Sequence, residues 1–297
     1  MSQPQAPQGD PVPLAESAGP GTKARLVCVL GDAHLDVIVR IQGPVAPDSD
    51  TAARTLVSVG GQGANVAAWV AALGGRTRLI AARAADTAAE LVTAELSRRG
   101  VELTGPRIAG AHTGVVVSLS DRGSQRSMLT DRGAGPLLTP EAIERRWLDG
   151  CDWLHLSAYS LLAEPVWAAA LAAVGAARAS GTRVSLDLSS TTAIEQYGAA
   201  EFRALVIRLS PDLIFGTRAE TALLGPLPAA KVVTKLGADG VLVGGRHYPA
   251  LTVQAVDATG AGDAFAAGYL VGGVQLGLEA AARAVATMGA MPVVAIP

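Results

Sequence analysis

The sequence is poor in charge, aromatic rings and cysteine, and these shortages exclude several classes of protein. Charged residues make up 17% of the 297 residues, and the formal net charge is −2. This balance gives no electrostatic reason to bind nucleic acid or an anionic membrane. Hydrophobic residues make up 49% of the chain, which excludes an intrinsically disordered protein. We therefore expect a compact globular fold.

Long apolar runs and targeting patterns are also lacking. No stretch reaches the roughly 18 to 20 apolar residues that span a bilayer. Residues 1–24 are rich in Pro, Gly and Gln without a basic-then-apolar signal pattern, so we expect a disordered tail before a folded domain at 25–297. The two cysteines, Cys28 and Cys151, lie in separate apolar runs. We expect them to be buried, reduced thiols in a cytoplasmic protein.

From residue 25 onward, short β-branched runs alternate with Ala-rich amphipathic stretches. The alternation of strand and helix predicts an α/β fold with a mainly parallel sheet covered by helices on both faces. The expected strands are 25–31, 77–82, 152–157, 182–188, 212–216 and 231–237, and the expected helices include 63–75, 87–100 and 164–181.

Two segments break this rhythm. Residues 36–58 contain two period-2 stretches around a Pro/Asp/Ser turn, and residues 114–132 resemble a hairpin around "DRGSQ". We expect residues 36–58 to form a small β-element that acts as a lid, and residues 114–132 are a second candidate for it. The alternative is a pair of ordinary surface hairpins.

The stretch "DATGAGDAF", residues 257–265, combines a glycine-rich turn with two acids. If Gly260, Ala261 and Gly262 precede a helix, their backbone amides converge on one anionic oxygen. Asp263 would stand beside them, placed to accept a hydroxyl proton during phosphoryl transfer. The helix N-terminus is expected to lower the pKa of this carboxyl. The alternative interpretation of this stretch is an ordinary helix whose N-terminus is capped by Asp.

A second glycine-rich turn, "GGQGANVA", covers residues 60–67. Glycine leaves room for close approach to the start of the following helix. Asn65 offers a donor and an acceptor, which suits a sugar hydroxyl better than a phosphate. Alone this pattern is weak, because such turns are usually tight connections.

Together the two stretches resemble the two signatures of the PfkB family of carbohydrate kinases, in the same order and at a similar spacing. The resemblance extends from Leu26 to the C-terminus. It implies a ribokinase-like three-layer α/β/α fold with a small β lid. It also implies an ATP-dependent kinase with Asp263 as catalytic base and an anion hole at Gly260–Gly262.

The resemblance also assigns substrate-binding residues. "GDAHLDV" resembles the segment whose final acid, here Asp36, binds sugar hydroxyls. Gly61, Gln62 and Asn65 fall at substrate-binding positions, although many members have Lys where this chain has Gln62. His34 is more typical of a structural histidine than of a substrate contact.

Nucleotide-binding positions follow from two further stretches. "VVTKLGADGVLV" resembles the strand–turn–strand that lines the ATP site, with Gly237 and Gly240 in the turn. Lys235 stands where Thr is frequent and could bring a point charge to a phosphate; an exposed strand-end Lys is the alternative. In "FGTRAETALL", Glu220 matches the residue that helps position Mg²⁺, whereas Thr217 replaces Asn.

Two other positions bear on ions and on the substrate. Asp257 and Thr259 match a stretch that in many members helps to hold a monovalent cation, commonly potassium. Many members read Gly-Ala-Asn where this chain has Gly135 as the third residue. Arg132 beside it could meet an anionic substrate group, but an ion pair is the favoured interpretation.

The sequence therefore predicts an ATP- and Mg²⁺-dependent kinase of a small free sugar, with K⁺ as a candidate activator and dimerisation through the lid as an expectation. The nearest alternative is a nucleoside kinase for adenosine or pseudouridine. The low aromatic content, 4%, disfavours a stacked base, although one ring would be enough. A sugar phosphate or a sugar acid would need Arg132 or another Arg in the pocket. A non-catalytic ligand-binding homologue is the alternative from another class.

Overall fold

The computed structural model describes residues 24–120, 126–227 and 231–293. The tail predicted for residues 1–24 lies, except for its last residue, outside the described residues. In the described part of the chain, no helix is long and apolar enough to cross a membrane.

A nine-stranded sheet forms the centre of the molecule, in the order β15-β14-β13-β12-β11-β10-β1-β4-β6. Neighbours from β13 to β6 pair in parallel, and β14 and β15 continue the sheet as antiparallel strands. The strands are β1 Leu26–Leu30, β4 Arg76–Ile80, β6 Glu102–Thr104, β10 Trp153–Ser157, β11 Arg183–Asp187, β12 Leu213–Thr217, β13 Lys231–Lys235, β14 Val241–Val243 and β15 Arg246–Tyr248. Strands β5 Arg83–Ala84 and β7 Arg107–Ile108 form a separate small sheet.

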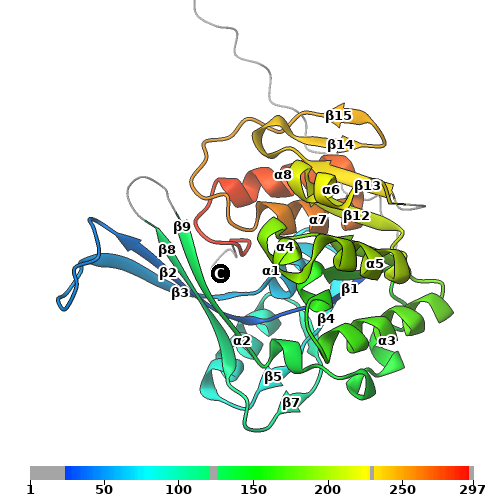
Figure 1. The fold of residues 1–297 in the computed structure, drawn as a ribbon, viewed down its shortest axis with the longest axis horizontal. Helices are drawn as coiled ribbons and strands as arrows, with labels where there is room; N and C mark the ends of the chain where they lie inside the picture. The colour runs from blue at the N-terminus through cyan, green and yellow to red at the C-terminus, as the bar shows by residue number, and fades with distance from the viewer. Residues whose placement is uncertain (1–23, 121–125, 228–230, 294–297) are drawn as a thin grey trace, which may run out of the picture.

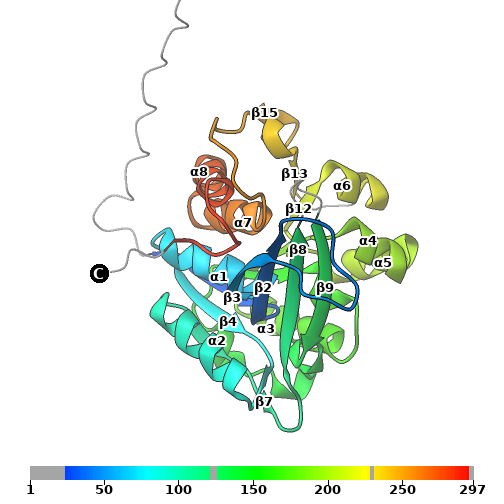
Figure 2. The same ribbon diagram turned by 90° about the vertical axis from the view of Figure 1, so that its left-hand side faces the viewer.

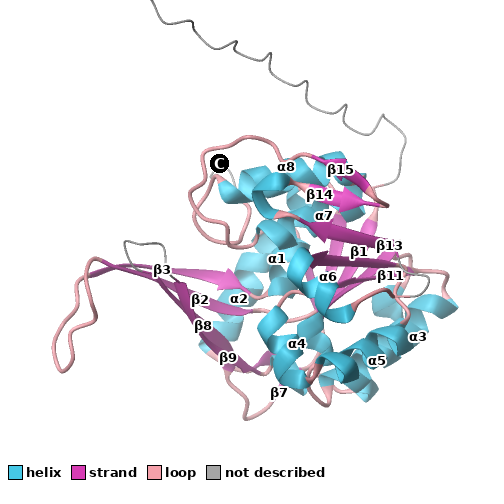
Figure 3. Cartoon of the chain, turned by 45° about the horizontal axis from the view of Figure 1, so that its top comes forward, coloured by secondary structure: helices cyan, strands magenta, loops and turns pink. Residues whose placement is uncertain are grey.

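Helices cover both faces of this sheet, which gives three layers (Figure 3). The strands are apolar on both faces because each must bury alternate residues against a different helical layer. On β1, Val27 and Val29 pack toward one layer, while Leu26, Cys28 and Leu30 pack toward the other. The first layer contains α1 Gln62–Ala72, α2 Thr87–Arg98, α7 Ala261–Gly272 and α8 Val274–Val285; the second contains α3 Val166–Ala179, α4 Thr191–Tyr197, α5 Ala199–Leu209 and α6 Arg218–Leu224. The predicted α/β fold class is confirmed.

A second, four-stranded sheet projects from this body, at the left of Figure 1 and toward the viewer in Figure 2. It consists of β2 His34–Ile41, β3 Ala53–Gly60, β8 Thr113–Ser120 and β9 Arg126–Gly133, in the order β3-β2-β8-β9. Residues 36–58 supply most of the antiparallel pair β2–β3, and residues 114–132 supply most of the antiparallel pair β8–β9. Strand β2 pairs with β8 in parallel, which joins the two pairs into one sheet. We call this second sheet the lid sheet.

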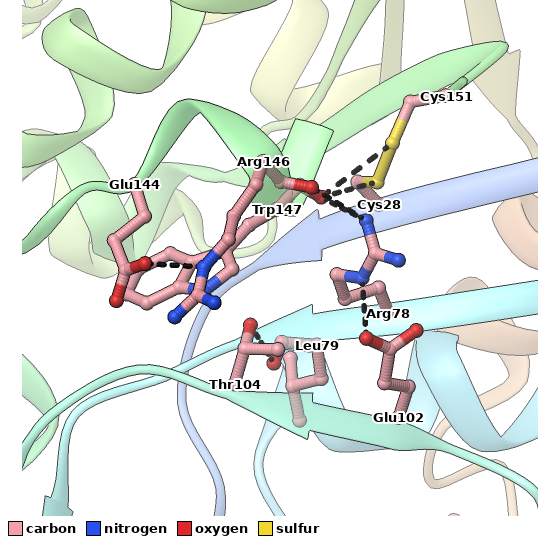
Figure 4. Close-up of polar contacts among 9 residues, drawn as sticks. All are labelled: Cys28, Arg78, Leu79, Glu102, Thr104, Glu144, Arg146, Trp147 and Cys151. Atoms are coloured by element: carbon pink, nitrogen blue, oxygen red, sulfur yellow. Dashed lines mark hydrogen bonds and ion pairs between the residues drawn. A yellow bond between two sulfur atoms is a disulfide. The ribbon is translucent and has the colours of Figure 1, made fainter. Parts of the chain in front are cut away.

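The expectation of reduced thiols is wrong for this structure, which joins Cys28 and Cys151 in a disulfide (Figure 4). Cys28 lies on β1, and Cys151 precedes the neighbouring strand β10; their Cα atoms are 6.1 Å apart. The two sulfurs share the space beside the Trp147 carbonyl oxygen, which also accepts a hydrogen bond from Arg78 at 2.6 Å. The sequence places the cysteines in unconnected apolar runs, and only the parallel pairing of β1 with β10 brings them together.

Candidate active site

Polar side chains gather at the carboxyl edge of the central sheet, where the parallel strands end. Asp187 ends β11, Thr217 ends β12 and Lys235 ends β13. The strand register places Ser157 opposite Asp187 and Thr217 opposite Lys235. Parallel strands deliver their last residues to the same edge, which is where open α/β sheets bind ligands.

Asp263 lies over this edge, in the first turn of α7. Gly260 is the N-cap residue, with a left-handed φ of 73°, and a Cβ there would come within 2.6 Å of Ala290. The Ala261 amide donates to the Ala258 carbonyl oxygen at 3.3 Å. The Gly262 and Asp263 amides belong to the first turn, for which a helix provides no internal partner. An anion would therefore meet these two amides rather than that of Ala261. We call the turn Gly260–Asp263 the anion cradle.

The expected lowering of the Asp263 pKa is wrong. Desolvation raises the pKa of Asp263 to about 7, and the nearby charges of Asp187 and Asp36 add to the rise. A hydrogen bond from Asn65 Nδ2, 2.8 Å from Asp263 Oδ2, and the charge of Lys235 oppose it without cancelling it. The expected lowering takes into account only the dipole of α7. The loss of solvent where α7 packs against α1 has a larger effect on the pKa of Asp263. A carboxyl that titrates near pH 7 is well matched to general-base chemistry.

The start of α1 brings the other predicted substrate residues close to Asp263. Gly61 has φ 97°, and a Cβ on it would lie 2.4 Å from the Asp32 carbonyl oxygen, so only glycine fits. Asn65, 7% exposed, has a buried Oδ1 without a hydrogen-bond partner in the described structure. Gln62 Nε2 is likewise buried and without a hydrogen-bond partner there.

Asp36 reaches the same region from the lid sheet. Its carboxyl occupies the space beside Gly60, where a Cβ would come within 2.2 Å of it, and its Oδ1 lies 3.3 Å from His34 Nδ1. Strand β2 is adjacent to β3, and Gly60 ends β3 directly before α1. The chain therefore passes from the lid sheet directly into α1. This short connection keeps Asp36 of β2 close to the polar residues at the start of α1.

Lys235 is not the exposed strand-end residue of the alternative interpretation. Its Nζ lies 2.7 Å and 3.0 Å from the two carboxylate oxygens of Asp187, and its side chain is 15% exposed. Burial alone would lower the pKa of Lys235, but the carboxylates of Asp187, Glu220 and Asp263 together outweigh burial and the pKa is raised. The ammonium is therefore charged at neutral pH.

A cavity of about 510 Å³ opens beside the anion cradle. Lys235, Gly262 and the turn residues Gly237, Ala238 and Gly240 line it. Apolar side chains form the remainder, among them Val241, Leu251, Val253, Phe265 and Leu278. Such a cavity suits an apolar ring system whose charged end points toward the cradle.

Comparison with known proteins identifies the family. The model of the pfkB family carbohydrate kinases matches residues 24–294. The chain is 33% identical over 274 residues to a fructokinase from Escherichia coli, covering 85% of this chain and 86% of that protein. It is 32% identical over 262 residues to an ATP-dependent ribose-1-phosphate kinase from Halopiger xanaduensis, covering 82% and 84%.

This chain belongs to the PfkB family of carbohydrate kinases. It is accordingly an ATP-dependent phosphotransferase. Among solved structures it is similar to adenosine kinase from Sinorhizobium meliloti, with a TM-score of 0.81, 25% identity, and coverage of 92% of this chain and 97% of that one. The fold is also shared with an uncharacterized sugar kinase from Pyrococcus horikoshii in complex with ATP, with a TM-score of 0.78, 21% identity, and coverage of 90% and 95%.

In this PfkB kinase, Thr217 and Glu220 form the capping box of α6. The Thr217 amide donates to Glu220 Oε2 at 2.8 Å, and the Glu220 amide donates to Thr217 Oγ1 at 3.3 Å. Only Oε2 of Glu220 takes part in this cap. No group of three or more His, Cys, Asp or Glu side chains in the described residues is arranged to hold a metal ion. Oε1 of Glu220 lies outside the cap, and a carboxylate oxygen is a ligand type that suits Mg²⁺ and its bound waters.

Arg132 of this kinase makes the favoured ion pair. Its Nε lies 2.6 Å from Asp32 Oδ2 and its Nη2 lies 3.1 Å from Asp32 Oδ1. The guanidinium also lies over the Tyr159 ring, 5.6 Å from its centroid. A Cβ at Gly135 would come within 2.5 Å of Asp32 Oδ1. The departure from Gly-Ala-Asn at Gly135 therefore makes room for the pair.

The Asp257 carboxylate organises the loop before α7. Its Oδ1 accepts hydrogen bonds from the Thr259 amide at 2.9 Å and the Thr259 hydroxyl at 2.5 Å, and its Oδ2 accepts one from the Gly289 amide at 3.1 Å. These contacts tie the loop to the segment that follows α8.

Asp187 is the site residue that the sequence interpretation missed. The pattern of residues 182–188 predicts only a strand, although that strand ends in a carboxylate at the edge where ligands gather. A polar residue at the last position of a buried parallel strand is the signal that could have found it.

Proposed function

We propose that this kinase phosphorylates a hydroxyl of a small free sugar, with Asp263 as the general base. The observation that carries the proposal is the pair of buried polar atoms at the start of α1 that have no hydrogen-bond partner in the described structure, Asn65 Oδ1 and Gln62 Nε2. Buried polar groups normally have hydrogen-bond partners, and leaving one unpaired costs about 1–3 kcal/mol. Sugar hydroxyls both donate and accept, so a polyhydroxy substrate could satisfy both the Asn65 acceptor and the Gln62 donor.

A free sugar is favoured over an anionic one. Arg132, the cation that the sequence offers for an anionic substrate group, is already neutralised by the buried Asp32. Asp36 and Asp263 add negative charge to this end of the site, which disfavours a carboxylate or phosphate on the substrate. The fructokinase relative supports the same substrate class, whereas the ribose-1-phosphate kinase relative favours a phosphorylated sugar.

The proposed reaction needs little covalent chemistry from the protein. The substrate oxygen attacks the terminal phosphorus of ATP, the bond from that phosphorus to ADP breaks, and Asp263 accepts the hydroxyl proton. Asn65 orients the Asp263 carboxylate through its 2.8 Å hydrogen bond. The amides of the anion cradle stabilise charge on the transferred group. Asp36 and Gly61 would orient the sugar, and the lid sheet would exclude water.

The nucleotide is proposed to lie in the 510 Å³ cavity, with its base against apolar side chains and its phosphates toward Lys235. Gly237 and Gly240 would line its path. A Mg²⁺ ion bound with the nucleotide would supply neutralisation of the phosphate charge. Glu220 Oε1, which is outside the capping box, is the carboxylate oxygen available to hold a metal-bound water.

Potassium activation and a cytoplasmic location remain predictions. Asp257 and Thr259 shape the loop in which a monovalent cation would lie, and a several-fold higher rate in K⁺ than in Na⁺ would support that site. Because Cys28 and Cys151 form a disulfide, the expectation of reduced thiols no longer supports a cytoplasmic location. The use of ATP as phosphoryl donor still supports that location.

We also propose that the protein dimerises through the lid sheet. Large hydrophobic side chains are exposed on it, including Leu129 at 59%, Val57 at 56%, Leu56 at 46% and Met128 at 45%. Exposed apolar residues gathered on one element are typical of an interface between chains.

The nucleoside alternative is supported by the adenosine kinase neighbour. The experiment that separates the candidates is ADP release with MgATP and a panel of free sugars, nucleosides, sugar phosphates and sugar acids, in K⁺ or Na⁺. Stimulation by free sugars that is lost in Asp263→Asn is the expected result. Stimulation by nucleosides alone would replace the sugar assignment. Silence of the wild type across the panel would favour a non-catalytic binding protein.

A further inference from the structure

The Asp187–Lys235 ion pair stands apart from the substrate residues and lies against the anion cradle. Asp187 ends β11 and Lys235 ends β13, so the pair bridges across the end of β12. Both side chains are largely buried, at 5% and 15% exposure. A buried ion pair adds little net stability, because desolvation of the two charges offsets their attraction. Fold stability alone therefore gives little reason for placing it here.

The location of the Lys235 ammonium suggests a functional reason for the ion pair. A Cβ built on Gly262 would lie 3.1 Å from Lys235 Nζ, so the charge touches the backbone of the cradle. Glycine at this position allows that approach. Lys235 and Gly262 also both line the cavity. The ammonium therefore stands where a phosphoryl group bound by the cradle amides would arrive.

Three carboxylates surround this single cation. Asp187 holds it through both oxygens, and the charges of Glu220 and Asp263 also act on it. An ammonium has three donors, so Lys235 can keep a hydrogen bond to Asp187 and give another to a phosphoryl oxygen. Without Asp187, the nearest attractive alternatives are Glu220 and Asp263, and pairing with Asp263 would block the base.

We propose that Asp187 is a positioning residue that holds the Lys235 ammonium at the rim of the cradle, where it contacts the transferred phosphoryl group, and keeps it off Asp263. This inference rests on the proposed function, in which the cradle receives that group. The two residues then act as a unit, in which Lys235 supplies the charge and Asp187 fixes its place.

A double-mutant cycle tests this coupling. Lys235→Met should lower kcat about 100-fold, the scale seen when one transition-state donor is removed, while KM for the sugar changes little. Asp187→Asn should lower kcat about tenfold in the wild type, because Lys235 then pairs with Asp263, but by less than about twofold when Met already replaces Lys235. Lys235→Arg should restore part of the loss. Lys231→Met, an exposed lysine at the start of the same strand, is the matched control and should behave as wild type.

Binding measurements keep the inference testable if no sugar is turned over. By calorimetry, Lys235→Met should weaken β,γ-imido-ATP about tenfold, as expected for a charge-assisted hydrogen bond, and ADP less than about twofold. Equal effects on both nucleotides would show that Lys235 does not meet the terminal phosphate. Multiplicative kcat losses in the cycle, or losses confined to thermal stability, would overturn the coupling between Asp187 and Lys235. A wild type that binds both nucleotides but phosphorylates nothing would count against the proposed substrate and leave the test of Lys235 intact.

Discussion

At the scale of single residues, the environment of Asp263 decides how the kinase should respond to pH. Its carboxyl faces Asn65, Asp36, Asp187 and Lys235, and its pKa of about 7 reflects mainly the loss of solvent. A base must be ionised to accept a proton. Activity should therefore depend on pH in the neutral range, well above the range expected for an ordinary Asp.

We predict that kcat/KM falls about tenfold per pH unit below pH 7 and levels off above it. The physical reason is protonation of Asp263. A pH–rate profile from pH 5 to 9 with saturating MgATP checks this. A profile that is flat between pH 5 and 7 would contradict the assignment of Asp263 as a base with a raised pKa.

Stability should change in the opposite sense. The unfolded-state pKa of Asp263 is near 3.8 and its folded-state pKa is about 7. Between these values the folded protein keeps a proton that the unfolded chain releases, so this residue's contribution to the free energy of unfolding falls as pH rises. Asp263→Asn removes that contribution. Urea unfolding at pH 5 and pH 8 should show that the variant gains more stability relative to the wild type at pH 8 than at pH 5.

Gly135 offers a second residue-scale test. Gly135→Asn should displace Asp32 from Arg132 and lower the free energy of unfolding by about 1–3 kcal/mol, the usual cost of overpacking. The matched control is Gly175→Ala, because Gly175 lies in α3 with nothing within 4 Å of a Cβ. That change should stabilise by up to about 1 kcal/mol. If Gly135→Asn unfolds at the same urea concentration as wild type, the packing argument fails.

At the scale of elements, the capping box of α6 explains why Thr217 is compatible with the fold. Thr217→Ala should lower stability by about 0.5–2 kcal/mol, because the Glu220 amide loses its partner. Thr217→Asn should be nearly neutral, since Asn is an equally good N-cap. Thermal unfolding measures both. Equal losses in the two variants would show that the cap does not fix the start of α6.

The elements themselves could be predicted more readily than the contacts between them. A strand such as β1, which is buried on both faces, leaves a continuous apolar run in the sequence. A helix such as α2, which is buried on one face, leaves a helical repeat of apolar residues that ends at a glycine. Asp187 with Lys235, Asp32 with Arg132, and Cys28 with Cys151 join residues far apart in the chain. No local pattern contains those pairs. The pKa of Asp263 could not be predicted from the start of α7 alone, because the packing of α1 against α7 sets its burial.

At the scale of the whole molecule, the lid sheet carries the prediction about assembly. Leu129→Glu should shift the protein toward monomer in sedimentation velocity at micromolar concentration, because it places a charge on the most exposed large side chain of that sheet. Leu91→Glu is the control, since Leu91 on α2 is also exposed, at 50%, but outside the lid sheet. A wild type that stays monomeric at every concentration would contradict dimerisation.

The hydrogen bond between Asn65 and Asp263 joins residues 198 positions apart. Its two ends are made early and late during synthesis, so a ribosome must release nearly the whole chain before the base meets its partner. Most strands of the central sheet precede residue 236 and could begin to pair before then. Phosphotransfer would thus begin only when the last helices dock, and enzymatic activity would report the completion of folding rather than its onset.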